Sequence, residues 1–329
     1  MPNPPVIAFD DPELSEEALT PAVADEIRAA LSPSDPYHVV VNELRSEETA
    51  AAAYPGPSAA WARRTVAIAA RRRGALVGYA YARRKETPPH HWRLDVFCQS
   101  SDASAVRITM VLASAIRERV EGQKVEWWSR GAHVMVTDSV AAQLGARRSR
   151  VIRRMDMLLR RAQLPPPAPV RSLDPDDIPA LVEVNNAAFA GHAERGGLDV
   201  TALRSELQRL GNRHQDVLVS APEGIINGFC WTRVAPEARL DRVVAPHARG
   251  EIYVLATHPL TKTLGLGAGL LAAGLDHIRR NLGADEAILY VDEANGHAIR
   301  LYEGFGFIDS NAPLVCHLLD HGTGPAPTA

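Results

Sequence analysis

The residues best suited to chemistry lie near the C-terminus, where Gly265, Gly267 and Gly269 precede an apolar-faced helical pattern. Glycine has no Cβ, so its backbone can approach a ligand closely, and the unpaired N–H groups at a helix N-terminus attract anions. The turn therefore has the form of a phosphate cradle. Glycines before a helix are also ordinary turn residues, and neither a GK[ST] ending nor a complete dinucleotide pattern is present, so the neighbouring elements must decide.

Those neighbours alternate between strand and helix. Residues 251–257 are rich in β-branched and aromatic residues without helical spacing, which predicts a buried strand, and residues 270–280 predict a helix with basic residues in its last turn. A second strand is predicted at 287–291, and a short helix lies within 295–307. The sequence thus predicts a strand, a glycine-rich turn, a long helix, a strand and a short helix.

Two segments in this order resemble motifs of the GNAT acetyltransferases. Residues 262–267 resemble the family's acyl-CoA turn, Q/R-x-x-G-x-G/A, and residues 295–307 resemble its later N-x-x-A-x-x-x-Y-x-x-x-G-F segment. Two motifs at the family's spacing are more specific than either alone. The resemblance implies an α/β (α+β) fold with a mixed, mostly antiparallel sheet flanked by helices.

Length and composition limit the alternatives. A chain of 329 residues suits two domains, and a net charge of −3 gives no overall preference for nucleic acid, so the expected partner is a small molecule. The three cysteines are far apart, without a CxxC pair, which predicts a reduced, cytoplasmic protein. We expect no signal peptide and no membrane span. We also expect no metal site, because the adjacent histidines at 90 and 91 point to opposite sides of the chain.

The N-terminal half repeats the order of elements at a nearly constant offset, which predicts two tandem GNAT folds. Strands are expected at 65–70, 75–81, 92–97, 125–128 and 151–159, with a turn at 71–74. A helix is expected at 103–121 and a short helix at 139–144. Residues 15–31 have helical spacing and predict a further helix. The basic run 71–73 fits either a polyanion patch or, as we favour, a solvated turn.

The first copy differs at its turn, where residues 100–107 contain no glycine and Asp102 adds a negative charge. Side chains there would keep the backbone away from a pyrophosphate, so this copy is expected to have lost acyl-CoA binding and to serve a structural or substrate-shaping role. The proline-rich segment 163–169 predicts a stiff linker. The predicted domains are a degenerate GNAT domain at 1–164, a catalytic GNAT domain at 165–320 and a flexible tail at 321–329.

The second half resembles the mycothiol synthase family more closely. The resemblance rests on residues 184–197, Trp231 to Arg233 and residues 250–254. It implies acetyl transfer from acetyl-CoA, bound in the C-terminal copy, to the cysteinyl amine of cysteinyl-glucosaminyl-inositol. Arg233 stands where lysine is usual, and the turn has Lys262, Thr263 and Leu264 in place of Gln or Arg and further basic residues.

Acetyl transfer from a thioester needs a neutral amine, a polarised carbonyl and a proton for the thiolate. The resemblance assigns the amine's proton to Glu251, the thiolate's proton to Tyr302 and the carbonyl oxygen to the backbone N–H of Leu255. An α-amine titrates near ~8 and a lysine near ~10.4, so a modest base suffices for the former. Without the resemblance, Glu251 could be an exposed strand-end carboxylate, and Tyr302 could simply pack the helix against the sheet.

The resemblance also implies contacts with both substrates. Acyl-CoA would contact Leu255, Ala256, Thr257, Lys262, Thr263, Leu264, Gly265, Leu266, Gly267, Ala268, Asn295, Ala298 and Arg300. The acceptor would contact Glu194, Arg233, Glu251 and Tyr290. Other functions stay open: a tandem GNAT protein acting on an aminoglycoside or a natural-product amine, and a non-catalytic acyl-CoA sensor. We expect a monomer or a homodimer.

Overall fold

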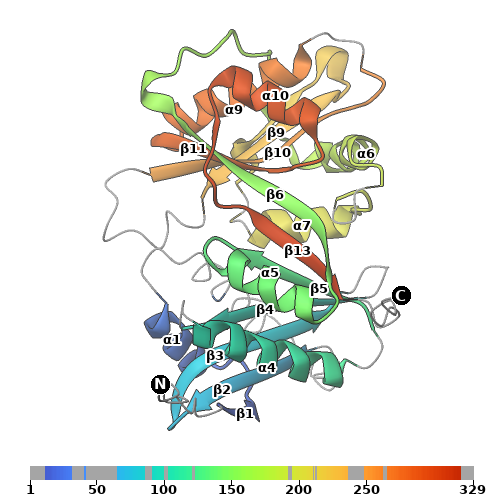
Figure 1. Ribbon diagram of the computed structural model, residues 1–329. Helices are drawn as coiled ribbons and strands as arrows, with labels where there is room; N and C mark the ends of the chain where they lie inside the picture. The colour runs from blue at the N-terminus through green and yellow to red at the C-terminus, as the bar shows by residue number, and fades with distance from the viewer. Residues whose placement is uncertain are drawn as a thin grey trace, which may run out of the picture. The chain divides into compact units, whose positions relative to one another are not determined.

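The computed structural model describes residues 12–31, 41, 65–85, 91–99, 103–120, 123–191, 195–209, 211, 213–235, 248–261 and 265–319. The chain forms two compact units that do not follow chain order. Unit 1 comprises residues 1–152 and 311–329, and unit 2 comprises residues 153–310. Each unit is a mixed sheet with helices on its faces (Figure 1).

Unit 1 has the strand order β1-β2-β3-β4-β5-β13-β6. Its elements are β1 (Glu13–Glu16), α1 (Pro21–Ala30), β2 (Thr65–Arg72), β3 (Ala75–Arg84), β4 (Trp92–Cys98), α4 (Ala103–Arg119), β5 (Val125–Arg130), α5 (His133–Gln143), the first half of β6 (Arg147–Leu158) and β13 (Leu314–Leu319). Strands β4 and β5 are parallel, and the other pairs with a known register are antiparallel. Helix α4 packs on one face of the sheet, and α1 packs on the other.

Unit 2 has the order β6-β11-β10-β9-β8-β7. After β6 come η1 (Leu159–Arg161), β7 (Arg171–Ser172), η2 (Pro175–Asp177), α6 (Ile178–Ala188), α7 (Val200–Arg209), η3 (His214–Asp216), β8 (Val217–Ser220), η4 (Pro222–Gly224), β9 (Gly228–Val234), β10 (Ala248–Thr257), α9 (Leu266–Arg280), β11 (Ala284–Asp292), α10 (Gly296–Phe305) and β12 (Ile308–Asp309). Helices α9 and α10 bury one face of the sheet, and α6 and α7 bury the other.

The two copies exchange their last strands. Strand β13, at the C-terminal end, pairs with β5 in unit 1, whereas β6, which follows β5 and α5 in the chain, lies beside β11 in unit 2 (Figure 1). The predicted limits, 1–164 and 165–320, follow chain order, whereas the compact units divide within β6 at 152/153 and return residues 311–329 to unit 1. The predicted tail at 321–329 lies outside the described residues.

Several predicted elements have different bounds in the structure. The helix expected at 15–31 is wrong at its start, because strand β1 occupies 13–16 and pairs with β2, and the helix begins only after Thr20, whose side chain accepts a hydrogen bond from Val23 N. The short helix expected at 139–144 begins at His133. Residues 100–102, where the first copy lacks glycines, are outside the described part of the chain.

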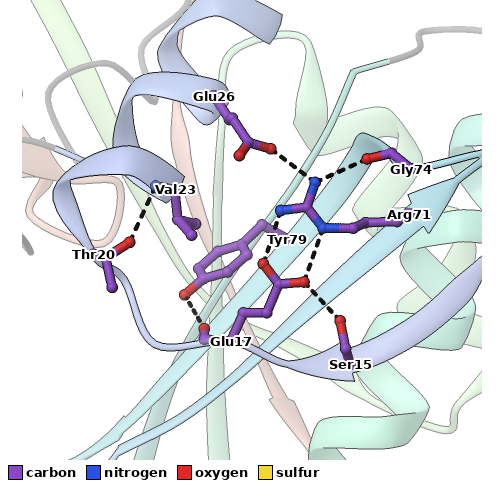
Figure 2. A network of polar contacts seen from close by, with 8 residues as sticks. All are labelled: Ser15, Glu17, Thr20, Val23, Glu26, Arg71, Gly74 and Tyr79. Carbon is purple, nitrogen blue, oxygen red and sulfur yellow. Dashed lines mark hydrogen bonds and ion pairs between the residues drawn. The ribbon is translucent and has the colours of Figure 1, made fainter.

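Arg71 does not lie in a solvated turn, as the sequence had led us to expect. It belongs to β2, and the turn consists of Arg73 and Gly74, both with positive φ. Figure 2 shows its guanidinium held by both carboxylate oxygens of Glu17 at 2.8 Å and by Glu26 at 2.8 Å. The Tyr79 hydroxyl donates to the Glu17 carbonyl oxygen at 2.7 Å. This network joins β1 and α1 to the β2–β3 hairpin.

Three further findings concern the described residues. None of their helices is long and apolar enough to cross a membrane. Cys98, Cys230 and Cys316 are buried and form no disulfide. No group of histidine, cysteine and acidic side chains in this part of the chain has the arrangement of a metal site.

Candidate active site

The predicted site lies where strand β10 leaves its parallel neighbour. Strands β10 and β11 pair only as far as Ile252 and Leu289, whereas β10 stays paired with β9 up to Thr257. The pairing of β10 with β9 shifts by one residue between Ile252 and Val254, so Tyr253 is the extra residue of a β-bulge. Such a bulge bends a strand away from its neighbour. From Tyr253 onward, β10 has no register partner on its β11 side within the described residues.

The sheet separates the predicted contacts into two sets. Side chains alternate along a strand, and Ile252 packs with α9, so Glu251 points to the α6/α7 face. By the same alternation Arg233 and Tyr290 lie on that face, because Cys230 and Leu289 pack with α9. Leu255 and Tyr302 belong to the α9/α10 side. The two predicted catalytic residues, Glu251 and Tyr302, thus lie on opposite faces of the sheet, whereas Ala256, predicted for the cofactor, packs on the α6/α7 face.

Glu251 is not the exposed strand-end carboxylate that the sequence alone allowed. Its side chain is 4% exposed, and both oxygens accept hydrogen bonds from Arg233, Nε to Oε2 at 2.8 Å and Nη2 to Oε1 at 3.1 Å. Glu251 and Arg233 are register partners on β10 and β9, which fixes this forked geometry. A buried carboxylate of this kind is stable only with its cation in place.

Tyr302 lies on α10 and is 9% exposed. Its ring packs edge-on against Phe307 at 6.0 Å between centroids, and within the described residues its hydroxyl has no hydrogen-bond partner. Burial raises the pKa of Tyr302 to about 12, with a smaller effect of nearby Cys230. The phenol therefore stays protonated at neutral pH, as a proton donor must.

Each of the three glycines of the turn can be explained by a different structural feature. Gly265 has φ +78°, a left-handed conformation that glycine adopts without strain, and it is the N-cap of α9. A Cβ on Gly269 would lie 2.8 Å from Ala168 Cβ, so this glycine allows the linker to pack on the helix. A Cβ on Gly267 would meet nothing closer than Leu301 Cδ2 at 4.0 Å, and one on Gly265 would meet nothing within 4 Å, so both glycines present an open backbone surface.

The other predicted contacts are distributed as follows. Asn295 is the N-cap of α10, and its side-chain oxygen accepts a hydrogen bond from Ala298 N at 3.1 Å. Arg300 is exposed on that helix. Leu266 is buried at the start of α9, Ala268 is half-buried two residues further on, and Ala256 and Thr257 end β10. Glu194, Lys262, Thr263 and Leu264 lie outside the described residues.

Three residues at the site were not singled out from the sequence. Tyr253 donates a hydrogen bond from its hydroxyl to Glu206 Oε1, and Arg195 Nη2 lies 3.7 Å from the same oxygen. The guanidinium carbons of Arg233 and Arg195 lie 3.8 and 4.6 Å from the centroid of the Tyr253 ring. Glu206 is on α7, far from the motifs in the chain, so spacing alone could not have identified it.

Unit 1 has the same strand separation but no bulge between β3 and β4. Strands β4 and β5 pair only as far as Asp95 and Trp128, yet the register between β3 and β4 runs without a shift from Gly78↔Cys98 to Arg84↔Trp92. The described part of β4 thus lacks a β-bulge like the one that shifts the register of β10 against β9.

A mixed sheet with a bulged strand, a parallel neighbour that separates from it and a glycine turn before the connecting helix defines a GNAT-type acyltransferase. Residues 181–307 match the model of the acetyltransferase (GNAT) family. A tandem GNAT protein from the clavulanic acid biosynthesis pathway has a similar solved structure, with a TM-score of 0.64, 14% identity and coverage of 95% of this chain and 99% of that chain. This likeness confirms the fold and its tandem arrangement.

Relatives with closer sequences carry a more specific name. A mycothiol acetyltransferase from Acidimicrobium ferrooxidans is 34% identical over 242 residues, which cover 71% of this chain and 75% of the relative. A mycothiol acetyltransferase from Salinispora arenicola is 35% identical over 206 residues, which cover 61% of this chain and 64% of the relative. The chain belongs to the mycothiol acetyltransferase family, and it is an acyltransferase enzyme.

Proposed function

We propose that the protein transfers an acetyl group from acetyl-CoA to the cysteinyl amine of cysteinyl-glucosaminyl-inositol. The observation that carries the proposal is that a buried carboxylate, Glu251, and a buried, protonated phenol, Tyr302, lie on opposite faces of a sheet whose strands β10 and β11 separate just past Glu251. An acceptor amine and a thioester that meet in such a gap have a proton acceptor on one side and a proton donor on the other.

The residues present fit acyl-CoA. The β10 backbone from Leu255 to Thr257 has no register partner on its β11 side, so it is suited to pairing with the amides of the pantetheine arm. Gly267 at the start of α9 leaves room for a pyrophosphate near the helix N-terminus. The backbone N–H of Leu255, two residues past Tyr253, is the proposed donor to the thioester oxygen.

The proton balance assigns each residue one task. The amine loses a proton toward Glu251, directly or through water, and attacks the thioester carbon. The C–S bond then breaks, and Tyr302 provides the hydrogen bond and proton that the thiolate needs. Overall, one N–H and one C–S bond are replaced by an amide C–N bond and a thiol S–H bond, so no other reactant is required.

The acceptor would lie on the α6/α7 face, where Arg233, Glu251 and Tyr290 are proposed to contact its polar groups. One observation favours a second candidate, the acetylation of a different polar amine. Arg233 stands where lysine is usual and uses two N–H groups to hold Glu251, a fork that a lysine ammonium cannot reproduce. That substitution alters the acceptor side and leaves the acyl-CoA side unchanged.

A panel of amines tests the acceptor. Purified protein would be given acetyl-CoA with cysteinyl-glucosaminyl-inositol, an aminoglycoside or a simple cysteine amide, and the acetylated product would be measured by mass. We expect kcat/KM to be highest for the cysteinyl-glucosaminyl-inositol amine. A higher kcat/KM for another amine would favour the second candidate, and acetyl-CoA binding without acetylation of any amine would favour an acyl-CoA sensor.

A further inference from the structure

Tyr253 occupies an unusual position in the strand that carries the site. As the extra residue of the bulge, it follows Ile252, which packs with α9, and precedes Val254, which packs with α6 and α7. Tyr253 and Val254 both pack on the α6/α7 face, although successive side chains of a regular strand point to opposite faces. The direction of the backbone beyond the bulge therefore depends on how the Tyr253 side chain is held.

The side chain of Tyr253 is held on several sides. Its hydroxyl donates to Glu206 Oε1, and its ring makes an edge contact with Trp231, with centroids 5.3 Å apart and planes at 90°. The Arg233 guanidinium carbon lies 3.8 Å from the ring centroid, within the range of a cation–π contact. Burial raises the pKa of Tyr253, which keeps its hydroxyl a donor.

The charges around the ring balance one another. Arg233 forms the ion pair with Glu251, and Arg195, whose guanidinium carbon is 4.6 Å from the ring centroid, lies 3.7 Å from Glu206 Oε1. The four charged side chains are at most 20% exposed. Two cations and two anions around one phenol form a network in which removal of a member leaves a partly buried charge uncompensated.

We propose that Tyr253, anchored by Glu206, is a positioning residue that couples the two halves of the site. Through its backbone it fixes the bulge and thus the direction of the Leu255 N–H. Through its ring it supports Arg233, which orients the carboxylate of Glu251. The inference rests on the proposed acetyl transfer, but it also makes a claim about the free protein: the order of β10 beyond the bulge depends on the bond between Tyr253 and Glu206.

Tyr253→Phe and Glu206→Gln test this role. The first removes the hydroxyl and keeps the ring, and the second keeps an oxygen acceptor and removes the charge. Glu183→Gln is the matched control, because Glu183 is an exposed carboxylate on the neighbouring helix α6. Each protein would be examined by hydrogen exchange of a peptide covering residues 251–258, by calorimetric titration with acetyl-CoA and by steady-state kinetics.

We expect Tyr253→Phe to increase exchange in this peptide about tenfold, since local opening no longer breaks the bond to Glu206. We expect kcat to fall by about tenfold or more, because the Leu255 N–H and Glu251 lose their alignment, while the Kd for acetyl-CoA changes less than about twofold. Glu206→Gln should show a smaller loss of kcat than Tyr253→Phe, and Glu183→Gln should match the wild type.

The outcomes distinguish this inference from the proposed function. If the wild type acetylates an amine and both variants keep its kcat and exchange rate, Tyr253 is not a positioning residue. If acetyl-CoA binding is lost in proportion to kcat, the residue acts on binding and the inference is also overturned. If the wild type acetylates no amine, the acetyl-transfer proposal fails, and unchanged exchange in Tyr253→Phe would still overturn the claim about the bulge.

Discussion

Burial is the main reason why the Tyr302 phenol keeps the proton that its proposed role requires. The packing of α10 against the sheet encloses the phenol and raises its pKa to about 12, above the ordinary value of 10.0. A raised pKa extends the range in which a phenol keeps its proton toward higher pH. Packing the helix and donating a proton are therefore compatible roles for Tyr302, although the sequence presented them as alternatives.

This pKa predicts the pH dependence of the reaction. If Tyr302 is the proton donor, kcat should not fall between pH 8 and about 10.5, because the phenol loses its proton only near pH 12. The measurement is kcat with both substrates saturating, after subtraction of the enzyme-free hydrolysis of the thioester. A fall in kcat with an apparent pKa near 10 would contradict the burial of the donor.

At the residue scale, the sequence suggested candidate residues but not their contacts. Glu251, Tyr302, Gly265 and Gly267 were chosen because they lie in segments that resemble the family, and each such segment is local in the chain. The pairing of Arg233 with Glu251 depends on the register of β9 and β10, and the bond from Tyr253 to Glu206 depends on the packing of α7, so neither followed from spacing. The bulge itself has no sequence signal that we recognised.

At the scale of elements, the glycine turn combines ligand approach with packing. Gly267 and Gly269 are two residues apart at the start of α9, but a Cβ would meet open space at the first and the backbone of Ala168 at the second. The motif match includes Gly267 and ends before Gly269. A larger side chain at 267 and alanine at 269 therefore separate the two reasons.

We expect Gly267→Leu to weaken acetyl-CoA binding without loss of stability, and Gly269→Ala to do the reverse. Leucine is used at 267 because the family's turn accepts alanine at this position. The added Cβ of Gly267→Leu meets only Leu301 at 4.0 Å, but the rest of the side chain lies where the backbone is proposed to approach the pyrophosphate. In Gly269→Ala, overlap with Ala168 should destabilise the fold by about 1–3 kcal/mol. Thermal unfolding and calorimetric titration measure both effects, and equal Kd values for Gly267→Leu and wild type would contradict the proposed cradle.

The network around Arg71 predicts the acid stability of unit 1. The hydrogen bonds from Arg71 lower the pKa of Glu17 from 4.5 to about 2. This carboxylate therefore stabilises the fold fully above pH 4.5, and its contribution is lost as the pH falls from 4.5 toward 2. The contribution is at most about 3 kcal/mol and is reduced by solvent, since both side chains are partly exposed.

Glu17→Gln tests this contribution through the free energy of unfolding between pH 2 and pH 6. We expect the variant to be less stable than the wild type at pH 6 and to lose less stability as the pH falls to 2. Glu118→Gln, at an exposed position of α4, is the control and should keep the wild-type slope. Parallel curves for Glu17→Gln and wild type would show that the ion pair contributes nothing.

At the scale of the whole molecule, the exchange of β6 and β13 makes each compact unit depend on both halves of the chain. The repeat of elements predicted two copies, and the proline-rich segment suggested a boundary near 164. Strand exchange was hidden from the sequence, because the residues of β6 and β13 predict strands without specifying which strand each one pairs with. Pairing partners are set by the tertiary fold.

The exchange predicts how a divided chain behaves. Fragments 1–164 and 165–329 expressed separately should be insoluble or unfolded, since the first lacks β13 and the second lacks β6. Expressed together, they should copurify as a complex with the circular dichroism and thermal unfolding of the intact chain. A fragment 1–164 that folds alone with a cooperative transition would contradict the exchange.

Glu251 and Tyr302 are proposed to act on the two substrates from opposite faces of one sheet. The most direct test of these roles is a comparison of wild type, Glu251→Gln and Tyr302→Phe with acetyl-CoA and the cysteinyl-glucosaminyl-inositol amine, with the acetylated product identified by mass. We predict turnover by the wild type, a loss in kcat of about 100-fold or more in each variant and an unchanged Kd for acetyl-CoA. Variants that bind acetyl-CoA normally and turn over at the wild-type rate would contradict the account.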